Sequence, residues 1–153
     1  MKSDYKWMEQ ALLQAQLAEI KDEVPIGAVI VKDDELIGFG HNKVISTSDP
    51  SAHAEISAIR QAAKNANNYR LPGATLYTTI EPCMMCAGAI IHARIQRVVF
   101  GATEPKAGTA CSNLSAFDLP FLNHKVEIVS GILERQCREI IQDFFQKKRA
   151  KQA

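Results

Sequence analysis

Two short motifs constrain this chain more than any other feature of its sequence. They are His53-Ala54-Glu55 and Pro82-Cys83-Met84-Met85-Cys86. Together they offer one imidazole and two thiols, which are ligands that zinc prefers, and one carboxylate. A structural zinc site normally has four protein ligands, whereas a catalytic site leaves one position to water. Glu55 is therefore either the fourth ligand or, as we favour, a proton carrier beside that water.

The spacing of the candidate ligands supports a single shared metal. Cys83 and Cys86 are three residues apart at the predicted start of a helix, so both thiols face the same way. The partial positive charge of a helix N-terminus favours the thiolate, which is the ligating form. His53 lies at the start of an earlier predicted helix, so two helix N-termini would converge on the metal. Glu55 reaches the same site only if the metal lies beyond the helix end.

Other interpretations of these motifs explain less. A His-x-Glu pair alone is weak support for a site, and a Cys-x-x-Cys pair also occurs as a redox pair or as half of a zinc finger. A zinc ribbon needs a second pair at matching spacing, which Cys111, His124 and Cys137 do not supply. We expect Cys111 and Cys137 to be free thiols. The combination of the two motifs therefore favours a catalytic metal.

Apolar periodicity predicts helices that alternate with strands. The predicted helices cover residues 4–21, about 51–63, 81–93 and 132–148. The predicted strands cover residues 28–31, 36–40, 74–79, 97–101 and 126–129, the first two as a hairpin. Residues 102–124 are expected to be irregular, with a short turn near 114–117. Trp7 and Met8 would pack the first helix onto the core, Asp49 or Ser51 would cap the second helix, and Pro82 would open the third.

Length and composition limit the class of protein. A chain of 153 residues, 46% hydrophobic and 23% charged, predicts one globular α/β domain over residues 1–153. No signal peptide is evident and no apolar run approaches the roughly 20 residues of a membrane span, so we expect a cytoplasmic protein with no membrane partner. The net charge of +1 carries little information, but basic residues cluster at the C-terminus from Lys147 to Lys151.

The motifs and their surroundings resemble the zinc-dependent nucleoside and nucleobase deaminases. The similarity extends over residues 49–55, 81–89, 98–102 and 123–124 and the ending Asp143-Phe144-Phe145 with basic residues. Over this extent the chain resembles the bacterial tRNA-specific adenosine deaminases, which convert the wobble adenosine of an arginine tRNA to inosine. The resemblance implies a three-layer α/β/α cytidine-deaminase-like fold with a central five-stranded mixed sheet. It also implies a homodimer with one zinc ion per subunit, for which Ile90 and Ile91 are candidate interface residues.

The resemblance also implies a mechanism. Zinc held by His53, Cys83 and Cys86 would lower the pKa of its bound water. Glu55 would take that proton and pass it to N1 of adenine during attack at C6. It would later protonate the leaving ammonia.

Substrate contacts are implied by the same resemblance. The substrate-binding residues would be Val24, Asn42, Ala54, Ile80 and Glu104. Asn42 would face the flipped base, and Val24 and Ile80 would line its pocket; the alternative for these two apolar residues is the core. Glu104 falls where the bacterial enzymes often have Asp.

RNA contacts are implied for Arg70, Arg94, Lys106, Asn123, Phe144, Phe145 and Arg149. A basic helix end with two aromatic residues suits RNA, because cations meet phosphates while an aromatic ring stacks on an unpaired base. The alternative is that one Phe packs the last helix and the basic residues complement its dipole. We expect one Phe to be buried and the other to meet an anticodon stem-loop, whose bases are already unpaired.

Two other functions remain open. A deaminase of a free nucleobase or nucleoside, such as guanine or cytosine, would use the same zinc motif but would not need Phe144-Phe145 with the basic residues after them. A noncatalytic RNA-binding or zinc-stabilised module would fill the fourth zinc position with a protein ligand. In such a module, replacing Glu55 with Ala would change nothing measurable.

Overall fold

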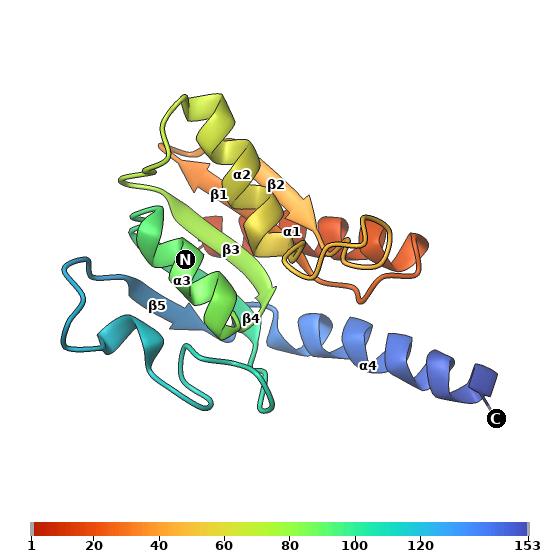
Figure 1. Ribbon diagram of the computed structural model, residues 1–153. Coiled ribbons are helices and arrows are strands. Elements are labelled where there is room, and N and C mark those ends of the chain that lie inside the picture. Colours follow the sequence, from red (N-terminus) through yellow and green to blue (C-terminus); the bar gives the residue numbers. More distant parts are fainter. Residues whose placement is uncertain (1, 153) are drawn as a thin grey trace.

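A five-stranded mixed sheet forms the middle layer of the computed structural model, which describes residues 2–152 (Figure 1). The strands are β1 (Gly27–Lys32), β2 (Glu35–His41), β3 (Thr75–Ile80), β4 (Arg97–Ala102) and β5 (Glu127–Ser130), in the order β2-β1-β3-β4-β5. β1 pairs antiparallel with β2 and β3, and β3, β4 and β5 run parallel. The predicted hairpin and the mixed five-stranded sheet are confirmed.

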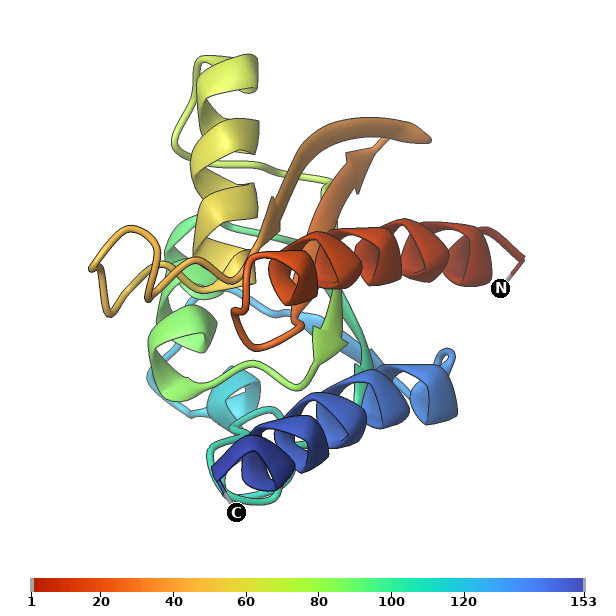
Figure 2. The ribbon, with the colours of Figure 1, turned by 90° about the vertical axis from the view of Figure 1, so that its right-hand side faces the viewer.

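Helices cover both faces of this sheet. They are α1 (Lys2–Ile20), α2 (Ala54–Ala66), α3 (Met84–His92) and α4 (Glu134–Gln152), with a short 3-10 helix, η1 (Ala116–Asp118). Figure 2 shows α1 and α4 on one side of the sheet and α2 and α3 on the other. The predicted three-layer α/β/α fold is confirmed. Along residues 2–152, no helix combines the length and the apolar character needed to cross a bilayer.

Each face of the sheet buries its own hydrophobic core, because successive strand residues point to opposite faces. On one side Ile30 and Phe100 pack beneath α2 and α3, and on the other side Val99 packs against α1 and α4. Trp7 and Met8 are buried beneath α1, as predicted.

One expectation about α3 is wrong. Ile90 is completely buried in the first core, and Ile91 packs against that core. Ile90 therefore cannot contribute to a dimer interface. The exposed apolar side chains of this helix are instead those of Met84 and Met85.

The starts of α2 and α3 differ from the prediction. The N-cap of α2 is His53, and the Asp49 carboxylate instead accepts hydrogen bonds from the Ser51 backbone N–H and hydroxyl in a local turn. The N-cap of α3 is Cys83, whose backbone is extended, so Pro82 precedes the helix and does not open it. Two candidate metal ligands thus occupy the N-cap positions of two helices.

α2 lies unusually close to β2, and Gly40 makes this possible. A Cβ atom at Gly40 would lie 2.8 Å from the Ala54 carbonyl oxygen and 2.6 Å from the Ser57 Cβ, closer than real Cβ contacts allow. The close approach brings the first turn of α2 beside the end of β2. His53 is thereby placed near the segment that carries Asn42.

Candidate active site

His53, Cys83 and Cys86 form a compact group of metal-ligating side chains. Their ligand atoms all lie within 4.8 Å of one another. The His53 Nδ1 is 3.6 Å from the Cys83 sulfur and 3.5 Å from the Cys86 sulfur. Zinc bonds of about 2.0 Å to nitrogen and about 2.3 Å to sulfur in a tetrahedron place such atoms about 3.5 Å apart. The three residues therefore fit a zinc ion, and the predicted convergence of two helix N-termini is confirmed.

The electrostatics of this group also suit a cation. A hydrogen bond from the Cys86 thiol, with a further one from His53, lowers the pKa of Cys83 to about 4. The hydrogen bond to Cys83, together with burial, raises the pKa of Cys86. The hydrogen bond with Cys83 raises the pKa of His53. The lowered pKa of Cys83 favours its thiolate, which is the form that binds metal.

Glu55 lies in the first turn of α2, buried beside these ligands. Burial raises the pKa of its carboxyl to about 7, and its side chain is hydrogen-bonded to Cys86. The metal-ligating group contains His53, Cys83 and Cys86 and, within the described part of the chain, no fourth acidic, His or Cys side chain. This arrangement leaves Glu55 beside the group, where a carboxyl with this pKa exchanges a proton near neutral pH.

Asn42 follows β2 and offers an unpaired polar atom. The residue is only 6% exposed, and its side-chain oxygen has no hydrogen-bond partner. The nitrogen Nε2 of the neighbouring His41 is the other buried unpaired side-chain atom among residues 2–152. Leaving such groups unpaired costs free energy, so they mark a place where a ligand supplies the missing partner. Sequence reasoning missed His41, whose only signal was its position next to Asn42.

The remaining predicted substrate residues fall into two environments. Ile80, at the end of β3, and Glu104 line one pocket together with α4 side chains. Val24 is also half-buried, and neither it nor Ile80 belongs to a core cluster. Ala54 is completely buried in the core and does not face solvent.

Three of the predicted RNA-binding residues come together beside α4. Lys106, Phe145 and Arg149 line one pocket with Ile141 and Gln142. Ile141 and Gln142 also line the pocket of Ile80 and Glu104, so the two pockets are neighbours along α4 and are hereafter together called the α4 groove. Phe145 is 42% exposed, whereas Phe144 is buried at 7%. The prediction that one Phe is buried is confirmed.

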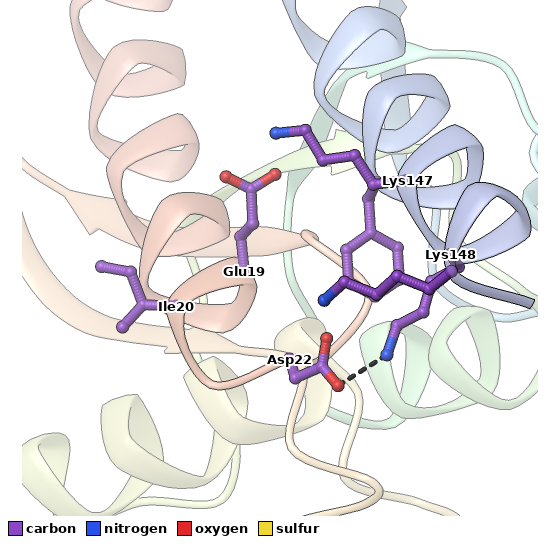
Figure 3. A pocket seen from close by; sticks show the side chains of 7 residues that line it. Glu19, Ile20, Asp22, Lys147 and Lys148 are labelled. Atoms are coloured by element: carbon purple, nitrogen blue, oxygen red, sulfur yellow. Dashed lines mark hydrogen bonds and ion pairs between the residues drawn. The ribbon is translucent and has the colours of Figure 1, made fainter.

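Contacts with α1 hold the C-terminal part of α4 in place. Figure 3 shows the ends of the two helices facing each other, with Lys148 joined to Asp22. The same ammonium group also makes a cation–π contact, 5.5 Å from the centroid of the Phe144 ring. The Lys148–Asp22 ion pair therefore joins the C-terminal part of α4 to the segment that follows α1.

The other predicted RNA-binding residues lie elsewhere. Arg70 and Arg94 line a separate pocket with His124, next to the segments that enter β3 and β4. Cys83 follows the opposite, carboxyl end of β3. Asn123 is exposed beside His124. Within a single chain, Arg70, Arg94 and Asn123 therefore lie away from the metal-ligating group.

Comparisons with known proteins agree with this geometry. The profile of the MafB19-like deaminase family matches residues 2–149. The chain is 51% identical to the tRNA-specific adenosine deaminase of Haemophilus influenzae over 147 residues, which are 95% of this chain and 85% of that protein. It is 43% identical to the tRNA-specific adenosine deaminase of Bacillus subtilis over 151 residues, which are 99% of this chain and 94% of that protein.

Solved structures show the same relationship. A structure from a study of A-to-I editing by tRNA:A34 deaminases at the wobble position of transfer RNA has a TM-score of 0.85 and 45% identity, covering 88% of this chain and 98% of that one. A guanine deaminase from Nitrosomonas europaea has a TM-score of 0.79 at 21% identity, covering 92% of this chain and 83% of that one, and shares the fold alone. The fold and site thus define a deaminase. Within that class, the chain belongs to the family of tRNA-specific adenosine deaminases.

Proposed function

We propose that this protein hydrolyses adenosine to inosine at the wobble position of tRNA, with arginine tRNA as a substrate. The observation that carries the proposal is the α4 groove, which joins Ile80 and Glu104 to the basic, aromatic group of Lys106, Phe145 and Arg149. A free nucleobase has no phosphate or neighbouring base to meet such a surface. The relatives at 43% and 51% identity are tRNA-specific adenosine deaminases, which supports adenosine in tRNA as the substrate.

The ligand group and Glu55 account for the chemistry. His53, Cys83 and Cys86 would hold zinc, which when bound lowers the pKa of a water molecule and supplies a nucleophile near neutral pH. Glu55 takes the proton that this water gives up and delivers it to N1 of adenine during attack at C6. It then takes the proton of the hydroxyl group added at C6 and donates it to the amino group, so that the C6 carbonyl forms and ammonia departs. Its burial beside the ligands keeps this proton away from bulk water.

Recognition of the base would rest on Asn42, whose unpaired side-chain oxygen is available to a base edge. Val24 and Ile80 would supply apolar walls, and Glu104 would meet the ribose or backbone. Phe145 is exposed enough to stack on an unpaired base, and Lys106 and Arg149 would meet phosphates. Because tRNA is the substrate, we place the protein in the cytoplasm.

We also propose a homodimer. The exposed Met84 and Met85 of α3 support an interface near the ligand group, since contiguous exposed apolar side chains mark contact surfaces. A second subunit would also offer a role for Arg70, Arg94 and Asn123, which lie apart from the site of their own chain. Sedimentation at micromolar concentration should give twice the mass of the chain, and Met84→Lys should give monomers.

A panel of substrates tests the proposed function. The purified zinc-loaded protein is incubated with an arginine anticodon stem-loop and, separately, with free adenosine, cytidine and guanine. We expect inosine in the RNA and little product from the free compounds. Robust activity on a free compound with none on RNA would establish the nucleobase or nucleoside alternative. Equal behaviour of the wild type and Glu55→Ala in every assay would instead indicate a noncatalytic module.

A further inference from the structure

Two loops flank the metal-ligating group, and each is attached to one buried carboxylate. The first loop, residues 42–52, follows β2 and begins with Asn42. The second, residues 103–115, follows β4 and carries Glu104 and Lys106. The attached carboxylates are those of Glu23, which is 0% exposed, and Glu81, which is 2% exposed. Neither residue has a part in the chemistry proposed above.

Glu81 is surrounded by hydrogen-bond donors of the second loop. Its carboxylate accepts bonds from the backbone N–H groups of Glu104 at 3.0 Å and of Cys111 and Ser112 at 2.9 Å each. The Ser112 hydroxyl donates a further bond. These donors lie 23 to 31 residues further along the chain. One carboxylate thus fixes both ends of the segment from Glu104 to Ser112.

Packing reinforces this attachment. The backbone N–H and hydroxyl of Thr109 donate to the Pro82 carbonyl oxygen at 2.9 Å and 3.1 Å. Gly108 lies directly against the Glu81 carboxylate, and a Cβ atom there would overlap it. The loop is therefore closed over Glu81-Pro82, the two residues that precede the ligand Cys83.

Glu23 holds the first loop in the same way. Its two carboxylate oxygens accept bonds from the backbone N–H groups of Ile45 at 3.1 Å and Ser46 at 2.6 Å. The base of that loop is closed by bonds from the Asn42 N–H to the Ile26 carbonyl and from the Lys43 N–H to the Ala52 carbonyl.

Both carboxylates depend on the hydrogen bonds from their loops, because neither has a cationic side chain as a partner. Among residues 2–152, neither Glu23 nor Glu81 forms an ion pair with Lys or Arg. A buried carboxylate without a cation depends on N–H and O–H donors for its stability, and such charge-assisted bonds are about twice as strong as neutral ones. Removing the charge leaves several loop donors poorly paired, which is costly for buried groups.

We propose that Glu23 and Glu81 are positioning residues, each of which fixes one wall of the substrate site. Glu23 sets the wall that carries Asn42, and Glu81 sets the wall that carries Glu104 and Lys106. The consequence for substrate rests on the proposed function. Loosening either wall should weaken RNA binding, while the ligand group and Glu55 keep their geometry. The kinetic result is a raised KM with kcat nearly unchanged.

A crossed experiment with Glu23→Gln and Glu81→Gln tests this proposal, with the exposed Glu35→Gln as a matched control. Amide hydrogen exchange is followed residue by residue in the zinc-loaded protein. We expect Glu81→Gln to speed exchange at Glu104, Cys111 and Ser112 by about tenfold or more and to leave Ile45 and Ser46 unchanged. Glu23→Gln should give the reverse pattern, and Glu35→Gln should change neither loop.

The same variants are assayed on the anticodon stem-loop. KM should rise about tenfold in both Glu→Gln variants, with kcat and zinc content within about twofold of the wild type. Faster exchange in both loops of either variant, unchanged exchange in both, or lost zinc would overturn the proposal, as would a fall in kcat at constant KM.

Two further results keep the experiment decisive. If Glu81→Gln does not fold, Ser112→Ala removes a single donor and should speed exchange at Glu104 and Cys111 by a smaller factor; no change there would overturn the role of Glu81. If the wild type deaminates no RNA, the proposed function fails, whereas the exchange pattern still decides whether the carboxylates position the loops.

Discussion

The metal-ligating group and the two loops beside it are built in different ways. His53, Cys83 and Cys86 come from two short motifs at helix N-termini, and their ligand atoms gather within 4.8 Å. The loops are fixed by hydrogen bonds to carboxylates 22 to 31 residues away in sequence. Chemistry therefore depends on local motifs, and recognition depends on long-range contacts. Changes in the first region should abolish activity, and changes in the second should reduce it by degrees.

The largest effect is expected from Cys86→Ala. Two ligands cannot hold zinc at a site built for three, so both the metal and the activity should be lost, with activity falling by at least about 10³-fold. Metal analysis and RNA deamination measure the two effects. Cys111→Ala is the matched control, because Cys111 is an exposed free thiol that bonds Glu81 through its backbone N–H. Full zinc in Cys86→Ala would remove this residue from the ligand set.

Glu55→Gln separates metal binding from proton transfer within the same region. The side chain keeps its size but cannot carry a proton, so the rate should fall by about 10²- to 10⁴-fold. One zinc ion per chain should remain, since Glu55 is not among the clustered ligands. Metal analysis alongside single-turnover kinetics measures this separation. Zinc lost in parallel with activity would show that Glu55 is a ligand.

Asp4→Asn tests a part of the molecule that belongs to neither region. Buried Asp4 accepts two bonds from Arg97 at 2.7 Å and one from the Tyr77 hydroxyl at 2.8 Å. Breaking such a pair should lower the free energy of unfolding by about 3 kcal/mol at pH 7, as measured by urea titration. Zinc content and activity below the melting temperature should be unchanged, which would confirm that the two regions act independently of this cluster.

The same variant has a defined pH dependence. The hydrogen bond with Arg97 holds the pKa of the Asp4 carboxyl below its ordinary value of 3.8. Its contribution to stability is therefore complete above about pH 4 and is lost as the pH falls through the lower pKa of the folded state. The stability difference between wild type and Asp4→Asn should shrink below pH 4. A constant difference down to pH 2 would contradict this assignment.

A smaller effect is expected where α4 borders its groove. Phe145→Ala should raise KM for RNA by about tenfold, because one base loses its stacking surface, and should leave the stability almost unchanged. Phe144→Ala is the matched comparison, since Phe144 is buried and its loss should reduce stability. Equal effects of the two substitutions on KM and on thermal stability would remove the distinction between them.

Much of the fold could be predicted from the sequence. The hairpin of β1 and β2 and the strands β3 to β5 follow from short runs of β-branched and apolar residues between turn residues. One wrong prediction concerned α3, whose sequence Met84–His92 is apolar on every side, so periodicity does not separate its buried face from its exposed face. Ile90 was therefore assigned to an interface although it lies in the core.

The site was only partly predictable for a related reason. His53, Cys83, Cys86 and Glu55 carry their chemistry in adjacent residues, which a motif displays directly. Glu23 and Glu81 act on backbone N–H groups, which every residue except proline possesses and which no residue pattern identifies. His41 likewise becomes notable only when burial leaves its Nε2 without a partner.

The central claim is that zinc-dependent chemistry and RNA recognition meet at one site. Its most direct test is sequencing of the anticodon of arginine tRNA after incubation with the zinc-loaded protein and with Glu55→Gln. We predict that the wobble adenosine is read as guanosine after treatment with the wild type, with other adenosines unchanged, and that it stays adenosine with the variant. An unchanged wobble position with the wild type, at one zinc per chain, would contradict the account.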